Sequence, residues 1–551
     1  MPSPNTPPRN AQMSNKQPPD SHSSGTQLAQ EREQVGESSH EYDKDVHASL
    51  PPATQSQHSH AGQSVRVRLD DALNNLPRQW DADPLPHIEA ALNASGRKIV
   101  ILDDDVMGTQ SVHDIAVLMD WSVDALCSEL ESDSRAFFVV TNARTMPESQ
   151  ARTVSAFITR NLCEAARQAG VDFSIVSRLD STLRGHFPTD MRAIESALAQ
   201  DSSAKPASDK AGNPNPSGWI IAPLFLEGGR FTINDTQYVL DGEWLAPVGE
   251  TEFARDPAFA FTSSNLRKWV EEKTSGEVPA DSVASVSIED LRLGGPERVA
   301  AILSTLSNSG ICVVSGANNR DMEVFVQGML QVESGGRRFL FRAAASFIKA
   351  LLGQTERQLL TPAELGMSAG SVGSDNGMLI VVGSHVPRTT GQLDHLLANT
   401  GARGVEANVS HLLADSTRQA EIDRSIRAAE DAVREGKDAV LYTSRALVEG
   451  RSADHSLAIG HQVSQAISEI VAGIGVRPRC VVVKGGATSY AVATKALTVR
   501  RAWSPGQAAP GVPAWILGDE TLHPGMPCII FPGNVGDDDA LTNLVVRLND
   551  R

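Results

Sequence analysis

The sequence predicts an α/β protein: two α/β domains with mainly parallel sheets and an active-site cleft between them, preceded by a disordered N-terminal tail. From about residue 96 onwards, short apolar runs alternate with stretches whose apolar residues recur at helical spacing. This alternation is typical of parallel sheets covered by helices. The main apolar runs end in glycine or polar residues, as strands do where they meet a ligand. A length of 551 residues exceeds what one hydrophobic core usually holds, which favours more than one domain.

Residues 1–85 form the predicted tail. They are rich in Ser, Gln, Pro, His and Asn and are nearly empty of apolar clusters. Such a segment cannot bury enough apolar surface to offset the conformational entropy that folding removes, so we expect it to be disordered.

The first domain, which we expect to bind the substrate, covers residues 96–352. Its predicted strands are the apolar runs Lys98–Leu102, Ala136–Thr141, Phe173–Ser177, Gly218–Ala222 and Gly310–Ser315. The stretch 147–169 carries apolar residues at helical spacing and predicts a helix. The segment 203–217 is polar and contains prolines, which predicts a surface insertion.

The second domain is expected over residues 378–551. A flexible stretch, 353–377, ends in GMSAGSVGSDNG and is the predicted linker. The core strands expected after it are Met378–Val382, Ala439–Tyr442, Cys480–Val483 and Cys528–Phe531, with helices over 415–434 and 456–474.

The amino-acid composition argues against some kinds of binding partner and cellular location. The formal net charge of −18 argues against a surface for nucleic acid or anionic membrane. No apolar run approaches the roughly 18 residues that cross a bilayer. The five cysteines form no CxxC pair, which favours buried thiols in a reducing compartment. We therefore predict a cytoplasmic protein with neither a nucleic-acid nor a membrane partner.

Charged and hydroxyl side chains follow the strands of the first domain. Asp103–Asp105 come directly after a buried strand, and TNAR and SRLDSTLRGH follow two others. Adjacent carboxylates repel one another, so a fold places them together where a cation, a proton or a hydroxyl binds. The alternative is a solvated acidic turn. Arg144, Arg178 and Arg184 either clamp a substrate carboxylate bidentately or neutralise the aspartates.

Glycine-rich turns follow the strands of the second domain. They read Gly383-Ser384-His385, Lys484-Gly485-Gly486-Ala487-Thr488-Ser489 and Pro532-Gly533-Asn534-Val535-Gly536. Glycine and serine at strand ends let backbone N–H groups approach phosphate oxygens closely, so three such turns predict a polyphosphate site. The sequence lacks both GxxxxGK[ST] and GxGxxG. The acidic run 537–539 either helps hold magnesium or favours the following helix N-terminus.

These motifs resemble those of the four-carbon acid sugar kinase family. The chain carries, in the same order, DDDVMGTQSVHD, SRLDSTLRGH, a Pro-x-x-x-x-Gly-Gly-Arg loop, GSHVPRTTGQ, KGGATS and GNVGDDDAL. The resemblance extends from about residue 97 to the C-terminus. It implies a sugar-acid-binding domain followed by a nucleotide-binding domain, and phosphorylation of threonate, erythronate or 3-oxo-tetronate with ATP. ATP and Mg²⁺ are the implied cofactors, and we consider a homodimer as the assembly.

The resemblance, together with the positions of polar residues at strand ends, gives expected roles for individual residues. The residues matched to family motifs are Asp104, Asp105, Asp180, Ser181, Thr182, Arg184, Ser384, Gly485–Thr488, Gly533 and Gly536. The expected catalytic residues are Asp104 and Asp105, of which Asp105 is the first choice as general base. The expected substrate-binding residues are Arg144, Arg178, Asp180, Ser181, Thr182, Arg184 and Arg230. The expected nucleotide-binding residues are Ser384, Gly485, Gly486, Ala487, Thr488, Gly533, Asn534 and Gly536. Asp538 is the candidate magnesium ligand, and His186 is the histidine best placed to touch the substrate.

Three departures from the family pattern leave other interpretations open. The chain has Met107 where the family usually has Thr, Ala487 where it has Glu, and Val535 where it has Phe. Loss of the hydroxyl and the carboxylate is compatible with a protein that binds sugar acid or ATP without turnover. A second alternative is a phosphatase of the haloacid-dehalogenase type, because Asp103-Asp104-Asp105-Val106-Met107 approaches its first motif, D-x-D-x-[TV].

Overall fold

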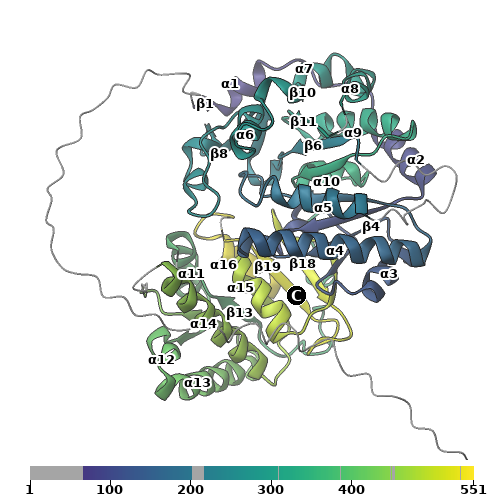
Figure 1. The fold of residues 1–551 in the computed structure, drawn as a ribbon. Coiled ribbons are helices and arrows are strands. Elements are labelled where there is room, and N and C mark those ends of the chain that lie inside the picture. Colours follow the sequence, from purple (N-terminus) through teal and green to yellow (C-terminus); the bar gives the residue numbers. More distant parts are fainter. Residues whose placement is uncertain are drawn as a thin grey trace, which may run out of the picture. The chain divides into compact units, whose positions relative to one another are not determined.

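The computed structural model describes residues 66–200, 216–307, 309–384, 386–446, 448, 453–533 and 535–550. Its main feature is one mixed sheet, flanked by helices (Figure 1). In spatial order, its strands are β10 (Ala284–Val286), β11 (Gly310–Val314), β6 (Gly218–Ala222), β12 (Leu340–Ala343), β5 (Phe173–Arg178), β2 (Lys98–Asp103), β4 (Ala136–Val140), β3 (Ile115–Leu118), β17 (Arg501–Ala509), β18 (Val512–Leu517), β19 (Pro527–Phe531), β16 (Val481–Lys484), β13 (Leu379–Val382), β15 (Ala439–Thr443) and β14 (Arg403–Ala407).

The sheet contains two parallel blocks. From β10 to β3 each neighbouring pair is parallel, and so is each pair from β19 to β14. The strands β17 and β18 lie between the blocks and pair antiparallel with their neighbours on both sides. The two predicted α/β halves are therefore present, and their sheets continue into one another.

Helices cover the sheet where the sequence has helical periodicity. Those of the first half are α2 (Leu85–Ser95), α3 (Val123–Glu131), α4 (Glu148–Ala169), α5 (Thr189–Gln200), α6 (Leu266–Lys273), α7 (Ile288–Arg292), α8 (Gly295–Ser304), α9 (Asn319–Ser334) and α10 (Ala345–Leu351). Those of the second are α11 (Pro387–Asn399), α12 (Val409–Leu413), α13 (Asp415–Arg434), α14 (Ala453–Gly473), α15 (Gly486–Ala491) and α16 (Ala540–Asn549). Residues 352–378 connect the halves through turns, where we predicted the linker.

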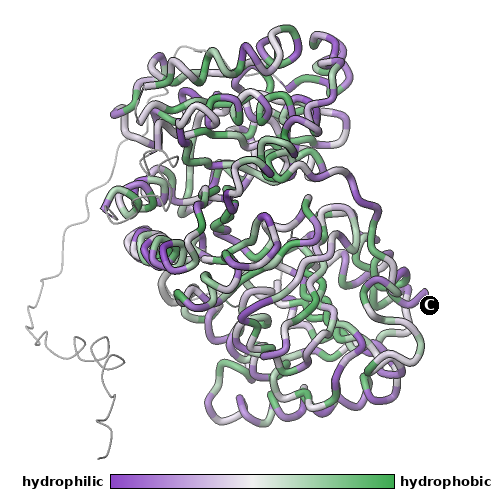
Figure 2. The backbone as a smooth tube through the Cα atoms, turned by 90° about the vertical axis from the view of Figure 1, so that its right-hand side faces the viewer, coloured by the Kyte–Doolittle hydropathy of each residue, from purple (hydrophilic) through white to green (hydrophobic). Residues whose placement is uncertain are grey.

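Alternate residues of each central strand pack into different cores. In β2, Ile99 and Ile101 join a cluster with residues of α2, α8, α9 and α10, whereas Val100 and Leu102 join one with residues of α3, α4, α5 and α6. Side chains of successive strand residues point to opposite faces, so an uninterrupted apolar run fits a sheet buried on both sides. Figure 2 shows the hydrophobic stretches inside and the hydrophilic stretches mostly outside.

The prediction of a disordered tail is wrong for residues 66–85. Here β1 (Val67–Arg68) pairs with β9 (Trp244–Pro247), at one edge of a small antiparallel sheet that also contains β8 (Thr236–Asp241) and β7 (Arg230–Ile233). The helix α1 (Leu69–Asn74) packs its leucines against this sheet. The few apolar residues of this segment are enough to order it, because the small antiparallel sheet provides apolar side chains for them to pack against. Residues 1–65, and 203–215 of the predicted insertion, lie outside the described residues.

Candidate active site

A cavity of about 1090 Å³ lies where the carboxyl ends of both parallel blocks meet. It brings together most of the residues that the sequence singled out. Those that line it are Asp104, Asp105, Arg144, Arg178, Asp180, Ser181, Arg184, Arg230, Ser384, Gly485, Gly486, Ala487, Thr488 and Gly533. Strand ends far apart in the sequence thus converge, as expected for parallel strands in one sheet.

Three predicted site residues lie away from the lining. Thr182 is buried and donates from Oγ1 to Asp180 Oδ2 at 2.8 Å, so it stabilises the turn that carries the aspartate. The Gly536 carbonyl accepts a hydrogen bond from Arg388 Nη1 at 3.0 Å. Asp538 is exposed on the turn before α16, which makes it a poor candidate for the magnesium ligand. Asn534 lies outside the described residues.

The first aspartate of the triplet is a buried residue beneath the site. Asp103 is only 1% exposed, and its carboxylate lies 3.7 Å from Arg178 Nη1. Burial raises the pKa of Asp103 to about 7, although Arg178 opposes the shift. A Cβ at Gly108 would lie 1.9 Å from Asp103 Oδ2, so only glycine fits there. The phosphatase alternative needs Asp103 as an accessible nucleophile, and its burial argues against that chemistry.

The other two aspartates face the cavity. Asp105 accepts a hydrogen bond from Arg144 on Oδ2, while its Oδ1 is directed towards the second half. A Cβ at Gly486 would lie 3.0 Å from Asp105 Oδ1, so this carboxylate closely approaches the turn that begins α15. Asp104 Oδ1 is buried and accepts no hydrogen bond from the described residues. Both carboxylates therefore retain an oxygen for a ligand.

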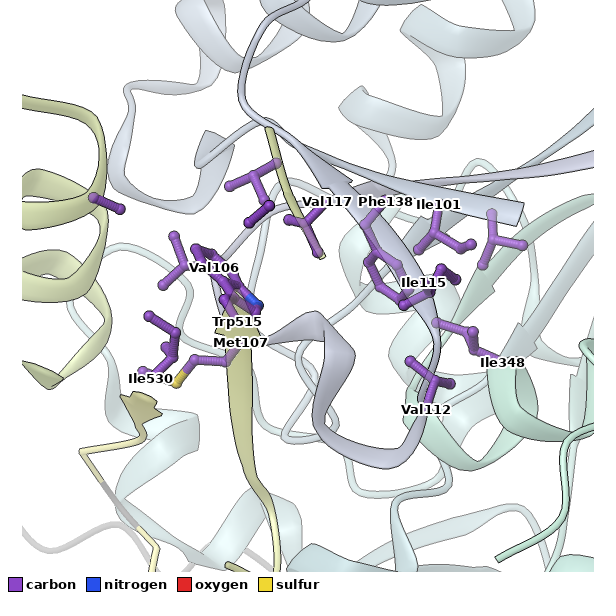
Figure 3. Close-up of a cluster of buried hydrophobic side chains, with 14 of the residues drawn as sticks. Ile101, Val106, Met107, Val112, Ile115, Val117, Phe138, Ile348, Trp515 and Ile530 are labelled. Carbon is purple, nitrogen blue, oxygen red and sulfur yellow. The ribbon is translucent and has the colours of Figure 1, made fainter. Parts of the chain in front are cut away.

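The loop that carries these aspartates packs between the two halves. Figure 3 shows Val106 and Met107 beside Trp515 of β18 and Ile530 of β19, all in one buried cluster. Trp515 also donates from Nε1 to Thr109 Oγ1 at 3.4 Å. These contacts fix Asp105 relative to the second half. They also place the Met107 side chain in the cavity lining, where the resemblance leads one to expect threonine.

Two of the four cavity arginines, Arg144 and Arg184, pair with aspartates that line the cavity. Arg144 pairs with Asp105 and lies 3.3 Å from Asp180 Oδ2 through Nη1. Arg184 Nη2 lies 2.6 Å from the same Asp180 oxygen. Burial acts to raise the pKa of Asp180, but Arg184 and Arg144 together hold it well below its usual range. Asp180 is thus an ionised anchor for two guanidinium groups.

The other two arginines keep capacity for a ligand. Arg178 donates from Nη2 to Gln110 Oε1 at 3.0 Å, and its Nε makes no hydrogen bond within the described residues. Arg230 is 8% exposed and makes no ion pair with a carboxylate in the described part of the chain. Its buried Nε also lacks a partner there. Of the two, Arg230 is the better candidate to hold an anion, because Arg178 already lies close to Asp103.

Close packing between the glycine turns shapes the second half of the site. A Cβ at Gly383 would lie 2.4 Å from Thr488 Oγ1, so the first turn packs directly on the second. Gly485 has φ +100°, a conformation that favours glycine, and its N–H donates to the Phe531 carbonyl at 2.8 Å. Gly486, Ala487 and Thr488 at the start of α15 line the cavity, and backbone N–H groups at such a position can bind phosphate.

The sequence did not reveal the apolar part of the cavity. We call it the apolar chamber; its members come from α12, the segment after β15, and α14. They are Val409, Ala446, Val448, Ile459, Val463 and Ile467. Their spacing in the sequence is that of ordinary core-facing residues, so no local pattern distinguishes residues of a binding site from residues of the hydrophobic core. A planar, largely apolar ligand group would fit against these side chains.

Arg342 of β12 was also missed. It is buried and pairs with Asp190 at the start of α5. A Cβ at Gly185 would lie 2.9 Å from Arg342 Nη2 and 3.2 Å from Asp104 Oδ2. Arg342 therefore supports the DSTLRGH loop from below. A single arginine within a short apolar strand does not differ in the sequence from any other strand residue, so its place beneath the site could not be predicted.

His186, the histidine that we expected to lie closest to the substrate, contacts backbone carbonyl groups. It is absent from the cavity lining, and its Nε2 lies 3.2 Å and 3.0 Å from the carbonyl oxygens of Ala143 and Met146. It fixes the loop that carries Arg144, and its ring meets Phe259 edge-on. Phe253, which sequence analysis overlooked, lines the cavity with Arg184 over its ring at 5.0 Å.

The carboxylates of the cavity are the candidates for binding a metal ion. Within the described ranges, no group of three or more His, Cys, Asp or Glu residues is arranged to hold a metal ion. Magnesium, however, is commonly held by one or two carboxylates together with substrate phosphates. Asp104 Oδ1, which accepts no hydrogen bond from the described residues and lies 4.0 Å from Arg144 Nη1, could serve as such a ligand.

Two family models match this chain, one for each half of the site. Residues 99–351 match a sugar-binding N-terminal domain, and residues 379–541 match a nucleotide-binding C-terminal domain. The chain belongs to the four-carbon acid sugar kinase family. The boundaries of the two family domains fall on either side of the connecting stretch 352–378.

Members of the four-carbon acid sugar kinase family resemble the chain over most of its length. The D-threonate kinase of Salmonella typhimurium is 25% identical over 479 residues, which cover 82% of this chain and 99% of the relative. The 3-oxo-tetronate kinase of Cupriavidus necator is 25% identical over 395 residues, covering 70% of this chain and 81% of the relative.

Solved structures share the fold. A crystal structure from Salmonella typhimurium has a TM-score of 0.57 at 16% identity, covering 82% of this chain and 99% of that one. A Haemophilus influenzae protein has a TM-score of 0.53, also at 16% identity, with 81% and 99% covered. The predicted fold class is therefore confirmed. Across the described parts of the chain, no helix is both long and apolar enough to span a membrane. The homodimer and the cytoplasmic location stay predictions.

Proposed function

We propose that this protein is an ATP-dependent kinase that phosphorylates the terminal hydroxyl of a four-carbon sugar acid such as threonate, erythronate or 3-oxo-tetronate. The observation that carries this proposal is the approach of the Asp105 carboxylate to the Gly486 turn across the cavity. This approach brings a candidate base of the sugar-binding half close to a candidate phosphate site of the nucleotide-binding half.

Arg230 is the proposed anchor for the substrate carboxylate. Its guanidinium is nearly buried, lines the cavity and makes no ion pair in the described residues. A planar guanidinium binds a carboxylate bidentately, which fixes both position and orientation. Ser181 and Gln110 also line this half and offer hydrogen bonds to substrate hydroxyls. With its carboxylate on Arg230, the acid would extend its other end towards Asp105.

The nucleotide would lie along the second half. Backbone N–H groups at Gly486–Thr488 and near Gly533 suit the phosphates, because glycine admits close approach of the backbone. The apolar chamber suits the adenine ring. Asp104 would hold Mg²⁺ through Oδ1, which accepts no hydrogen bond from the described residues, and the bound ion would neutralise phosphate charge.

The proposed mechanism is a direct transfer. Asp105 accepts the proton of the substrate hydroxyl while the hydroxyl oxygen bonds to the γ-phosphorus. The bond from that phosphorus to the bridging oxygen breaks, and ADP leaves. Arg144 holds Asp105 in place by its hydrogen bond to Oδ2. Phosphoryl transfer depends mainly on positioning and charge neutralisation, so this mechanism needs no covalent nucleophile.

The decisive experiment measures ADP release by the full chain with ATP and Mg²⁺. The panel contains D- and L-threonate, D- and L-erythronate and their 3-oxo forms. Release that depends on one acid would support the kinase and identify its substrate. Thermal stabilisation by ATP or an acid without any release would instead support the non-catalytic binding protein, which the Met107 and Ala487 departures kept open.

Replacing Arg230 by Gln should weaken binding of the acid selectively. We expect the KM for the acid to rise by about 10- to 100-fold, since a hydrogen bond to a charged group contributes roughly 1.5–3 kcal/mol. The Kd for ATP should stay within about twofold. The measurements are steady-state kinetics and calorimetry. Arg255→Gln is the matched control, because Arg255 is exposed nearby and lies outside the lining. Equal KM values for both variants would remove Arg230 from this role.

A further inference from the structure

Lys484 is a buried lysine at the level where the glycine turns begin. It is the last residue of β16, in register with Val382 of β13 and Phe531 of β19. All three residues directly precede turns that contain glycines of the cavity lining. Lys484 is 0% exposed; its Nζ donates to the Pro532 carbonyl at 2.8 Å and lies 4.6 Å from the centre of the Phe531 ring.

The surroundings of this ammonium group contain no compensating anion. Within the described residues, Lys484 makes no ion pair with a carboxylate, and the charged group that acts on it is Arg388. Burial, with a smaller effect of Arg388, lowers the pKa of Lys484 to about 7. A buried cation without a counter-charge destabilises the folded state. A bound anion would compensate the charge of the buried Lys484 ammonium group.

Among the described residues, the part of the cavity lining that comes from the second half has no charged side chain that could bind a polyphosphate. The residues of this part are Gly383, Ser384, Val386, Val409, Thr443, Ser444, Ala446, Val448, Ile459, Gly460, Val463, Ser464, Ile467, Gly485, Gly486, Ala487, Thr488, Gly533 and Val535. None of these described residues carries a charge. A polyphosphate placed there would meet backbone N–H groups and no cationic side chain of the lining. Lys484 is buried directly behind that lining.

We propose that Lys484 positions the phosphates of the nucleotide from beneath the glycine turns. Its hydrogen bond to Pro532 fixes the turn after β19 against the turn after β16, and its charge favours an anion above both. Electrostatic effects are strong here because the group is shielded from water. This inference rests on the proposed function, since it assigns to Lys484 the phosphates of the ATP proposed there.

The Lys484→Met variant of the full chain tests this role. We expect the KM for ATP and the Kd for ADP to rise about tenfold, equivalent to about 1.4 kcal/mol. The KM for the acid should stay within about twofold, because Arg230 and its neighbours are unaffected. The midpoint of thermal unfolding should change little, since methionine removes a buried charge that has no counter-charge, and this offsets the lost hydrogen bond to Pro532. Lys484→Gln keeps a donor for Pro532 without the charge and should show the same selective loss.

Lys98→Met is the matched control. Lys98 also donates from Nζ to backbone carbonyl oxygens, those of Ser132 and Ser134, but at the amino end of β2. Its replacement should leave both KM values unchanged. Normal ATP affinity in both Lys484 variants would overturn the inference, as would an equal rise of both KM values with a lower unfolding midpoint. If the wild-type protein itself bound no nucleotide, the proposed function would fail, and the role of Lys484 with it.

Discussion

The Asp105→Asn variant is expected to turn over about 10²- to 10⁴-fold more slowly than the wild-type protein, the usual contribution of a general base. Asparagine keeps the shape of the side chain and a carbonyl oxygen for Arg144, but it cannot accept the proton of the substrate hydroxyl. The Kd for ATP should change little, because Asp105 belongs to the sugar-binding half. ADP release under saturating ATP and acid gives the turnover, and calorimetry gives the Kd.

Asp114→Asn is a stringent control for this prediction. Asp114 is exposed, pairs with Arg357 at 2.8 Å, and has φ +51°, a conformation that asparagine tolerates as well as aspartate does. The same chemical change is thus made outside the cavity, and turnover should be normal. Near-normal turnover of Asp105→Asn would exclude Asp105 as the base. The matching change at Asp104 would then test the other carboxylate that faces the cavity.

The central strands could be predicted from the sequence because both of their faces are buried. Uninterrupted apolar runs such as those of β2 and β13 are typical of strands in a sheet that helices cover on both sides. Their boundaries were correct to within one or two residues. The helix α13 was predicted with its observed bounds because its apolar residues recur at helical spacing over five turns.

Elements that depend on distant partners could not be predicted. The strand β17 contains Ser504, Pro505 and Gly506 and becomes a strand by pairing with β3 and β18. That pairing joins the two halves into one sheet, which no local pattern indicates. The same reason explains β1 and α1, since their few apolar residues acquire a core only from the small antiparallel sheet.

For the candidate site, sequence reasoning identified the positions better than the roles. Polar residues at strand ends converge in any parallel sheet, so the cavity lining was largely foreseeable. Which arginine neutralises an aspartate and which stays unpaired depends on distances that sequence does not contain. Arg144 and Arg230 were indistinguishable as residues in loops, yet the first pairs with carboxylates and the second does not. Lys484 was visible in KGGATS, but its burial was not.

The Gly486→Ala variant is expected to lose about 100-fold in turnover without losing stability. The added Cβ would lie 3.0 Å and 3.3 Å from the two carboxylate oxygens of Asp105, and 3.3 Å from Met107 Cε. It would therefore crowd the Asp105 carboxylate, which is proposed to accept the proton of the substrate hydroxyl beside this turn. Misplacement of reacting groups by about 1 Å can cost about 10²-fold in rate. The fold should tolerate the change, because alanine favours the first turn of α15 more than glycine does.

Gly401→Ala is the control that separates crowding of the gap from the general effect of replacing glycine. Gly401 is exposed, and a Cβ there would meet no atom within 4 Å. Turnover and the unfolding midpoint of this variant should both match those of the wild-type protein. If Gly486→Ala also retained full turnover, transfer could not take place in the gap between Asp105 and the turn. The proposed meeting point of the two substrates would then have to move deeper into the cavity, towards Asp104.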